Sequence, residues 1–279
     1  MKTVIGLGGA GCKIADKFAQ REGYKIYKID ENLQGTRCYS FKKISSMEEA
    51  ESSVSSLKSF FKGLTKDVLF IVAGGGKISG ASLAILEQIR NKNVEILYVR
   101  PDLDTLSGVN IQSEKIVSQV LQNMTRSGVF QKMYLFDNQK IQEILQGVSL
   151  LKLNDSINEV IARSYDLTNF YQGQESVFGQ SGQVDEISRI ATFGFISFDD
   201  DIHRMCFDLE NITHAEIFYV VNEKILDEDS ELLYKIKQQV RSVSHEDMKS
   251  LQYSVHPSEY EGVQAYCRLH THYIQQEEN

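Results

Sequence analysis

The chain has 279 residues, of which 42% are hydrophobic and 24% are charged, a composition typical of a globular protein with one or two domains. Its 30 Lys and Arg residues against 38 Asp and Glu residues give a net charge of −8, which argues against nucleic acid or an anionic membrane as the partner of its surface as a whole. No apolar run reaches the about 18 residues of a membrane span, and no signal peptide precedes the first predicted strand. The sequence therefore predicts a cytoplasmic protein that does not bind a membrane.

Cysteine and histidine spacing gives no sign of a metal site. The four cysteines are scattered, and none pairs with another cysteine or a histidine at zinc spacing. His270 and His272 would share one face of a strand, but no carboxylate stands at a ligand spacing beside them. We expect reduced thiols and no metal ligands supplied by the chain.

The first glycine-rich segment is GLGGAGCK, which a short apolar strand at residues 2–6 enters and a helix ending at Gly23 follows. Glycines at a strand-to-helix turn let backbone N–H groups surround an anion at the positive end of the helix. The segment therefore predicts a phosphate-binding loop. Its candidate residues are Gly8, Gly9, Ala10, Gly11 and Cys12.

The same segment supports an alternative. Gly6, Gly8 and Gly11 satisfy the pattern GxGxxG, and Asp30 closes the next strand, where the ribose-binding acid of a dinucleotide site would stand. A Rossmann oxidoreductase that uses NAD(P) or FAD is therefore the main rival interpretation. A Walker P-loop is excluded, because no lysine followed by Ser or Thr ends the loop.

A second glycine-rich segment lies at residues 68–89, VLFIVAGGGKISGASLAILEQI. It predicts a buried strand, a turn at Gly74, Gly75 and Gly76, and a helix from near Ser79. Ser79 is expected to cap that helix and to donate its hydroxyl to a phosphate oxygen. The alternative is a flexible turn that binds nothing, since glycine clusters mark turns more often than ligands.

The remaining elements predict an α/β fold. A helix at 45–61, a strand at 94–99, a helical stripe around residues 116–124 and a strand at 133–136 continue an alternation that is typical of a Rossmann-like, doubly wound parallel sheet. Ligands of such sheets bind at the carboxyl ends of the strands, where Asn138 follows the last of them.

The second half predicts a smaller α+β domain with a mixed sheet. A helix at 142–168, broken near Gly147, should bury Leu150, Leu151 and the apolar residues after them between two domains. The elements expected beyond it are a short helix at 185–192, a strand at 193–198, an acidic turn at 199–201, a strand at 216–221, a helix at 229–242 and strands at 250–255 and 263–273. The predicted parts are a nucleotide-binding domain at 1–147, a central helix and loop at 148–183, and a C-terminal domain at 184–279.

With these loops placed, the chain resembles the tubulin/FtsZ superfamily of GTPases over nearly its whole length. IGLGGAGCK is similar to that family's opening loop, and AGGGKISGAS to its GGGTGTG signature, which adds Lys77 and Gly80 to the candidate site. The resemblance also implies nucleotide roles for Asp30 in KIDENLQ, for Asp104 in VRPDLD near the ribose, and for Asn138 and Asn158 at the guanine base.

The departures from the family pattern bear on activity. Lys77 and Ile78 stand where the family has Thr and Gly, and we expect Lys77 to offer its charge to the outer phosphates. The family's catalytic loop NxDxxD corresponds to residues 183–188, where Asp185 keeps the first acid, Ser188 replaces the second, and Glu186 is a candidate substitute.

The resemblance therefore implies a protein that binds GTP or GDP, with Mg²⁺ accompanying the nucleotide, and that assembles head to tail with itself into filaments. GTP would lie at the subunit interface, and hydrolysis would be slow and dependent on assembly. A small plasmid- or phage-type filament protein fits the pattern, with an unidentified adaptor as a further candidate partner. The remaining alternatives are the oxidoreductase and an interaction protein that keeps the fold without turnover.

Overall fold

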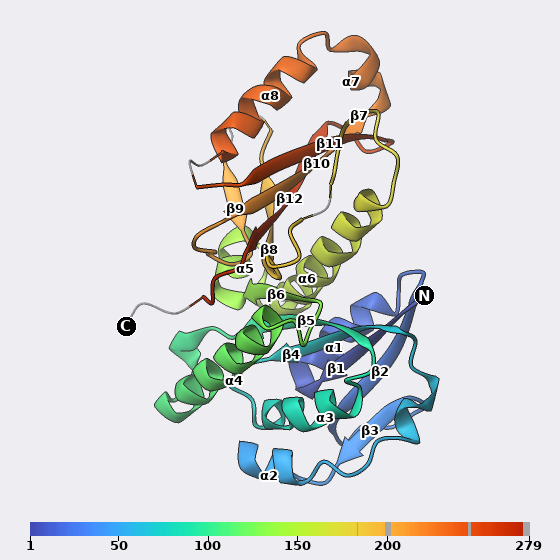
Figure 1. Ribbon diagram of the computed structural model, residues 1–279, viewed down its shortest axis with the longest axis vertical. Coiled ribbons are helices and arrows are strands. Elements are labelled where there is room, and N and C mark those ends of the chain that lie inside the picture. Colours follow the sequence, from blue (N-terminus) through green and yellow to red (C-terminus); the bar gives the residue numbers. More distant parts are fainter. Residues whose placement is uncertain (183, 199–201, 245–246, 276–279) are drawn as a thin grey trace. The chain divides into compact units, whose positions relative to one another are not determined.

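The computed structural model describes residues 1–182, 184–198, 202–244 and 247–275 (Figure 1). The chain divides into two compact units, Met1–Ala162 with Ile274–Asn279, and Arg163–Tyr273. We call them the N-terminal and the C-terminal unit. No helix among the described residues is long and apolar enough to cross a membrane.

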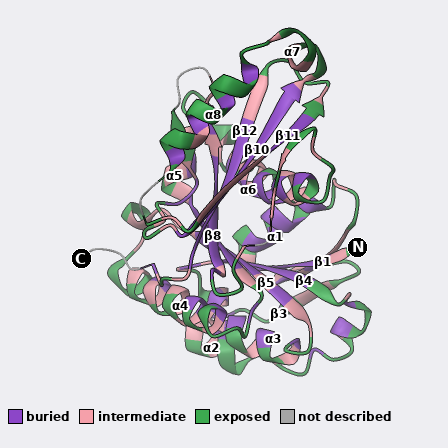
Figure 2. Ribbon diagram, turned by 45° about the horizontal axis from the view of Figure 1, so that its top comes forward, coloured by how far each residue is buried: buried purple, intermediate pink, exposed green. Residues whose placement is uncertain are grey.

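The N-terminal unit contains a parallel sheet with strand order β3-β2-β1-β4-β5-β6. Its strands are β1 (Lys2–Leu7), β2 (Tyr24–Glu31), β3 (Cys38–Phe41), β4 (Asp67–Ala73), β5 (Asn93–Arg100) and β6 (Lys132–Asp137). β1, β4, β5 and β6 are almost wholly buried, which explains their near-continuous apolar sequences (Figure 2). The predicted doubly wound sheet is confirmed, and β3, a short half-exposed edge strand, was not predicted.

The strand order reverses between β1 and β4. β1 pairs with β2 on one side and with β4 on the other, and the chain then builds outward in both directions. Open α/β sheets bind their ligands at such a reversal, outside the carboxyl ends of the strands. Both glycine-rich segments begin at this place, because they follow β1 and β4 directly.

The helices of this unit are α1 (Gly8–Phe18), α2 (Met47–Ser52), α3 (Ser82–Gln88), α4 (Gly108–Arg126) and α5 (Asn138–Ile144), with 3-10 turns η1 (Phe60–Gly63), η2 (Lys77–Ala81) and η3 (Leu103–Thr105). The predicted helix at 45–61 is wrong beyond its first turns, since α2 ends at Ser52. Serines crowd the segment that follows, and their side chains compete with helical backbone hydrogen bonds.

The long helix α6 (Leu150–Gln172) contributes residues to both units. The prediction that its first leucines are buried is wrong, because Leu150 and Leu151 are 83% and 98% exposed. Its buried face in the N-terminal unit begins at Ile157. One ion pair joins this part to Lys17 of α1, from Asp155 at 2.6 Å, and a second joins it to Arg21 in the turn after α1, from Glu159 at 2.5 Å.

The C-terminal unit contains the predicted mixed sheet, with strand order β8-β12-β10-β11-β7 and β9 paired to β8. Its strands are β7 (Phe178–Gln180), β8 (Ile190–Ile196), β9 (His203–Met205), β10 (His214–Asn222), β11 (Ser250–Ser258) and β12 (Val263–Thr271). Helix α8 (Leu232–Val243) buries Leu232, Ile236 and Val243 in a core cluster with β10, and α7 (Glu223–Glu228) precedes it. Tyr171 of α6 belongs to a second cluster, with Phe218, Val220 and Tyr266.

The predicted short helix at 185–192 is wrong. Asp185–Ser188 is a turn, in which the Ser188 N–H donates to the Asp185 carbonyl at 3.0 Å, and β8 starts at Ile190. The apolar residues from Ile190 onward pair with β12, and this sheet pairing decides against a helix. The predicted acidic turn at 199–201 and Gln183 lie outside the described residues.

Candidate nucleotide site

The N-terminus of α1 offers unsatisfied backbone donors. Its cap residue Leu7 makes no side-chain hydrogen bond, and its first turn contains no acidic residue. Gly9 and Ala10 are exposed. Gly8 precedes them with φ +71°, a backbone conformation that favours glycine. Exposed N–H groups at the positive end of an 11-residue helix favour an anion.

The second glycine segment is shaped differently from the prediction. A Cβ at Gly74 would clash with the Tyr98 hydroxyl, and one at Gly75 would lie 2.8 Å from Leu106 Cδ1. Glycine at these two positions therefore allows Tyr98 and Leu106 to pack against the backbone of the loop. Gly76 alone of the three faces open space, and it is the N-cap residue of η2, where it has no side chain to cover the backbone N–H groups. The open part of this loop is therefore Gly76 and the start of η2.

Ser79 and Gly80 belong to the framework of the second loop. The Ser79 hydroxyl is buried and donates to the Gly76 carbonyl at 2.5 Å, so the prediction that Ser79 caps the following helix is wrong. A Cβ at Gly80 would collide with the carbonyl of Met47. Both residues stabilise the loop through contacts inside the N-terminal unit. Lys77 is exposed.

The two loops lie against each other. A Cβ at Gly8 would be 3.6 Å from Ile78 Cβ, because β1 and β4 are neighbours and their loops leave the sheet together. Ile78, which stands where the resembled family has glycine, thus covers the turn into α1. The donors at Gly9 and Gly76 therefore belong to one edge of one sheet.

Asp30 lies at this edge beside α1. Its Oδ2 is 3.7 Å from where a Gly9 Cβ would be, and burial raises its pKa above the ordinary value. Cys12 points away from the edge, since its thiol is buried and donates to the carbonyls of Gly6 and Ile29. Burial raises the pKa of Cys12 to about 12, so only its backbone remains a candidate ligand. No group of three or more His, Cys, Asp or Glu side chains among the described residues could hold a metal ion.

A polar cluster closes the carboxyl ends of β5 and β6. The Asp137 carboxylate is buried, accepts from Arg100 Nε at 2.9 Å, and caps α5 by accepting from the Gln139 N–H at 2.7 Å. Asn138 follows, and its buried Oδ1 has no hydrogen-bond partner among the described residues. A buried amide oxygen without a donor costs free energy, so it is a place where a ligand donor would bind.

Two further predicted residues, Asp104 and Asn158, lie in η3 and on α6. Asp104 is exposed in η3, where its N–H donates to the Asp102 carboxylate at 3.1 Å. Asn158 is half-buried on α6, between the residues that pair with Lys17 and Arg21. Those contacts lie at and just after the C-terminal end of α1, and within the described residues no hydrogen bond or ion pair joins Asn158 to the glycine loops.

Asp185 and Glu186 belong to the C-terminal unit, and both are exposed. Asp185 Oδ2 lies 3.5 Å from Nε2 of the buried His214 and 3.9 Å from Lys249 Nζ. Burial lowers the pKa of His214, while the Asp185 carboxylate acts in the opposite direction. Ser188, at the second acid position, is buried and its hydroxyl lies 3.0 Å from that of Thr213.

Sequence reasoning missed two residues that support the second loop. The Tyr98 hydroxyl occupies the space beside Gly74 and donates to Glu114 Oε1 of α4 at 2.8 Å. Burial raises the pKa of Tyr98 well above its ordinary value, so the hydroxyl keeps its proton. Tyr98 lies within an apolar strand and Glu114 on a helix far along the chain, so no local pattern joins them.

Comparison with known proteins shows which fold the chain has. No protein-family model and no curated protein matches this sequence. Similar solved structures include FtsZ of M. jannaschii, with TM-score 0.68 and 14% identity over 96% of this chain and 87% of that chain. TubZ of Bacillus thuringiensis serovar israelensis has TM-score 0.69 and 15% identity over 97% and 86% of the two chains. CetZ1 of Haloferax volcanii has TM-score 0.68 and 16% identity over 97% and 94%.

The chain has the tubulin/FtsZ fold. This confirms the structural side of the resemblance that the glycine loops indicated, across 96% or more of the chain. At such low identity the likeness concerns the tubulin/FtsZ fold alone. The TubZ structure is a GTPγS-form protofilament and the CetZ1 structure a GDP-bound monomer.

Proposed function

We propose that the protein binds a guanine nucleotide at the carboxyl edge of β1, β4, β5 and β6. The observation that carries the proposal is the meeting of two uncapped turns, α1 after Leu7 and η2 at Gly76, at the reversal point of the sheet. Backbone donors gathered at such a point suit a polyphosphate. GTP or GDP also fits the tubulin/FtsZ fold, because CetZ1 binds GDP.

Each part of the nucleotide has a candidate partner. The N–H groups from Gly9 to Cys12 and at Gly76 would hold the phosphates, with Lys77 adding a positive charge. The unpartnered Asn138 Oδ1 would accept a hydrogen bond from the base. Guanine presents a ring N–H and an amino group as donors, and adenine presents its donors in a different arrangement. Mg²⁺ would be held mainly by phosphate oxygens and water, since the chain offers no carboxylate cluster among its described residues.

We further propose that the protein assembles head to tail, and that Asp185 of one subunit completes the nucleotide site of the next. Asp185 is exposed on the C-terminal unit, so it is available to a neighbouring subunit. TubZ, which has the same fold, forms a protofilament. A positioned carboxylate would orient the attacking water, and with only one of the family's two acids present, turnover would be slow.

The experiment that tests the binding proposal is nucleotide identification. The purified protein is denatured, and the released ligand is separated by chromatography. GDP or GTP is expected, and calorimetry should show GTP binding more tightly than ATP. Recovery of NAD or FAD would support the oxidoreductase instead, because GxGxxG with Asp30 also suits a dinucleotide.

Removal of the base contacts should weaken guanine binding. Asn138→Ala and Asn158→Ala are each expected to cost about 1–3 kcal/mol, because a buried donor or acceptor of the base loses its partner. Calorimetric titration with GTP measures the loss. Asn123→Ala, which changes an exposed asparagine on α4, is the control and should bind as wild type does. Equal affinity of the wild type for GTP and ATP would refute the assignment of the base site.

Lys77 should act on the outer phosphates only. Lys77→Ala is expected to weaken GTP binding about tenfold while leaving GMP unchanged, since one charge-assisted hydrogen bond contributes about 1.5–3 kcal/mol in favourable cases. Lys13→Ala, which removes an exposed lysine from α1, serves as the control for net charge. If GTP and GMP lose affinity equally, Lys77 does not contact the outer phosphates.

A further inference from the structure

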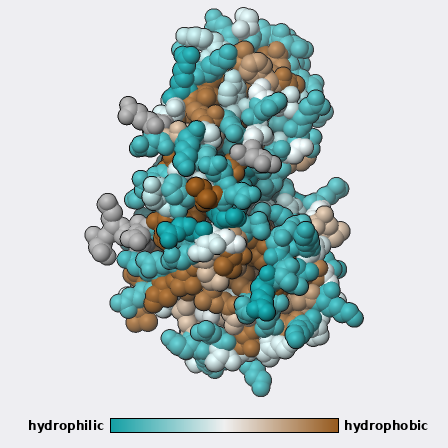
Figure 3. Space-filling view, viewed as in Figure 1, coloured by the Kyte–Doolittle hydropathy of each residue, from teal (hydrophilic) through white to brown (hydrophobic). Residues whose placement is uncertain are grey.

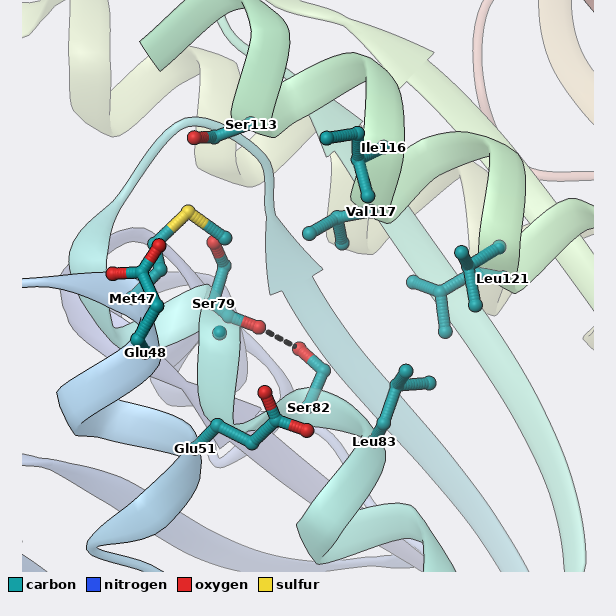
Figure 4. Close-up of a pocket in the computed structure, with 12 residues that line it drawn as sticks. Met47, Glu48, Glu51, Ser79, Ser82, Leu83, Ser113, Ile116, Val117 and Leu121 are labelled. Carbon is teal, nitrogen blue, oxygen red and sulfur yellow. Dashed lines mark hydrogen bonds between the residues drawn. The ribbon is translucent and has the colours of Figure 1, made fainter. Parts of the chain in front are cut away.

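A groove behind the second glycine loop lies between α2, η2, α3 and α4 in the N-terminal unit (Figure 4). Its cavity has a volume of about 220 Å³ and an apolar wall formed by Leu83, Ile116, Val117 and Leu121. Ile116 is 63% exposed and Leu83 38% exposed. Figure 3 shows hydrophobic atoms gathered along α4 and α3. Apolar side chains left open in this way favour an interaction surface.

One rim of the groove is acidic. Glu48 and Glu51 project from α2, one helical turn apart, and both are exposed (Figure 4). Neither forms an ion pair with any residue in the described part of the chain. Two carboxylates beside an apolar wall favour an occupant that is apolar and positively charged, and they disfavour anionic lipid and nucleic acid.

The size of the cavity favours protein side chains over a separate small molecule. At about 220 Å³ it is smaller than the about 300–1,000 Å³ of typical small-ligand pockets. Ile116, which belongs to the apolar wall, is also exposed outside the cavity. A helix that inserts one or two side chains and covers the rest matches this shape.

The C-terminal unit presents such a helix. α8 buries Leu232, Ile236, Gln239 and Val243, and every charged residue of its sequence LLYKIKQQVRSV is basic. Its outward face carries Tyr234, which is 64% exposed, with Lys237 and Arg241 one and two turns farther on. An exposed aromatic residue beside cations is typical of a residue that anchors an interface.

We propose that the groove binds α8 of a second copy of this chain. Tyr234 enters between Leu83 and Ile116, and Lys237 and Arg241 face Glu48 and Glu51. The spacings agree, since each pair of like charges spans about one helical turn. The contact joins two different surfaces, so each copy keeps one groove and one α8 free for further copies, and the assembly can grow. The side chains proposed to make it, Glu48, Glu51, Leu83 and Ile116, are not among those proposed to hold GTP, so the contact can be tested in nucleotide-free protein.

Charge reversal and complementation test the contact. Self-association of nucleotide-free protein is measured by sedimentation velocity across a range of concentrations at low salt. The groove variant Glu48→Lys/Glu51→Lys and the helix variant Lys237→Glu/Arg241→Glu should each associate at least about tenfold more weakly than wild type, because like charges then face each other. An equimolar mixture of the two variants should regain association, since the reversed charges are complementary. Tyr234→Ala should also weaken association.

The matched control is Asp227→Lys/Glu228→Lys, which changes net charge as the groove variant does but at exposed positions on α7. It should associate as wild type does, and thermal melts confirm that each variant folds. If the groove variant does not fold, Glu48→Gln/Glu51→Gln replaces it, with weaker association still expected. A wild type that is monomeric at every concentration, a groove variant that associates normally, or folded variants whose mixture does not associate would each overturn the proposal.

Discussion

Asp185→Ala is expected to reduce GTP hydrolysis by about 10²–10⁴-fold, the usual contribution of a positioned general base. Asp185 is an exposed acid in the turn before β8, at the first acid position of the family pattern, and the second acid position is the buried Ser188. GTP affinity should not change, because the proposed binding residues belong to the N-terminal unit. Phosphate release and calorimetry, measured on the same preparations, separate the two effects.

The rate of hydrolysis per subunit should also rise with protein concentration, since a single subunit holds only part of the proposed catalytic site. Asp227→Ala, which removes an exposed carboxylate from α7, is the matched control and should hydrolyse GTP as wild type does. Glu186→Ala tests the neighbouring candidate in the same assay. A specific activity that does not depend on concentration, or an Asp185→Ala variant with wild-type activity, would show that the catalytic acid lies elsewhere.

Glu216→Gln is expected to lower the free energy of unfolding by about 3–5 kcal/mol, the usual cost of removing one partner from a buried ion pair. Glu216 of β10 and Arg268 of β12 are 1% and 0% exposed. Glu216 Oε2 accepts from Arg268 Nε at 2.9 Å and from His270 Nε2 at 2.9 Å. Glutamine preserves the size of the side chain but removes the negative charge that faces the buried guanidinium at 2.8 Å.

This loss should depend on pH. Burial by itself raises the pKa of Glu216, but the charge of Arg268 and the contact with His270 outweigh it and lower the pKa from 4.5 to about 2. The stabilisation is therefore fully present above about pH 4.5 and is lost as the pH falls towards 2. The difference in stability between wild type and Glu216→Gln should shrink over the same range.

Urea unfolding at a series of pH values measures both effects. Glu223→Gln, at an exposed glutamate on α7, is the control and should change stability by less than about 0.5 kcal/mol. Replacing Glu216 and Arg268 together by methionine should recover most of the loss, because no buried charge then remains unpaired. A Glu216→Gln variant as stable as wild type would show that the pair contributes nothing measurable.

The sequence alone determined the elements whose signal is local. Buried parallel strands read as apolar runs, as in VLFIV of β4, and a glycine segment directly after a strand marks a turn into a helix. The alternation of strands and helices predicted the parallel sheet, and the order and spacing of the loops predicted the tubulin/FtsZ fold. These signals need no knowledge of distant residues, because hydrophobic periodicity and glycine geometry act within a few residues.

Only the tertiary structure decided what the individual side chains do. Gly74, Gly75 and Gly80 also make room for Tyr98, Leu106 and Met47, which lie where a side chain would be, and the glycine pattern alone does not show these contacts. Residues 185–192 looked helical, yet Asp185–Ser188 is a turn and pairing with β12 makes the chain from Ile190 onward a strand. Leu150 and Leu151 continue an apolar pattern and are nevertheless exposed, while Arg268 and Glu216 are charged and nevertheless buried. In each case a partner far away in the sequence determines the outcome, since burial and pairing are properties of the packed chain and not of a local window.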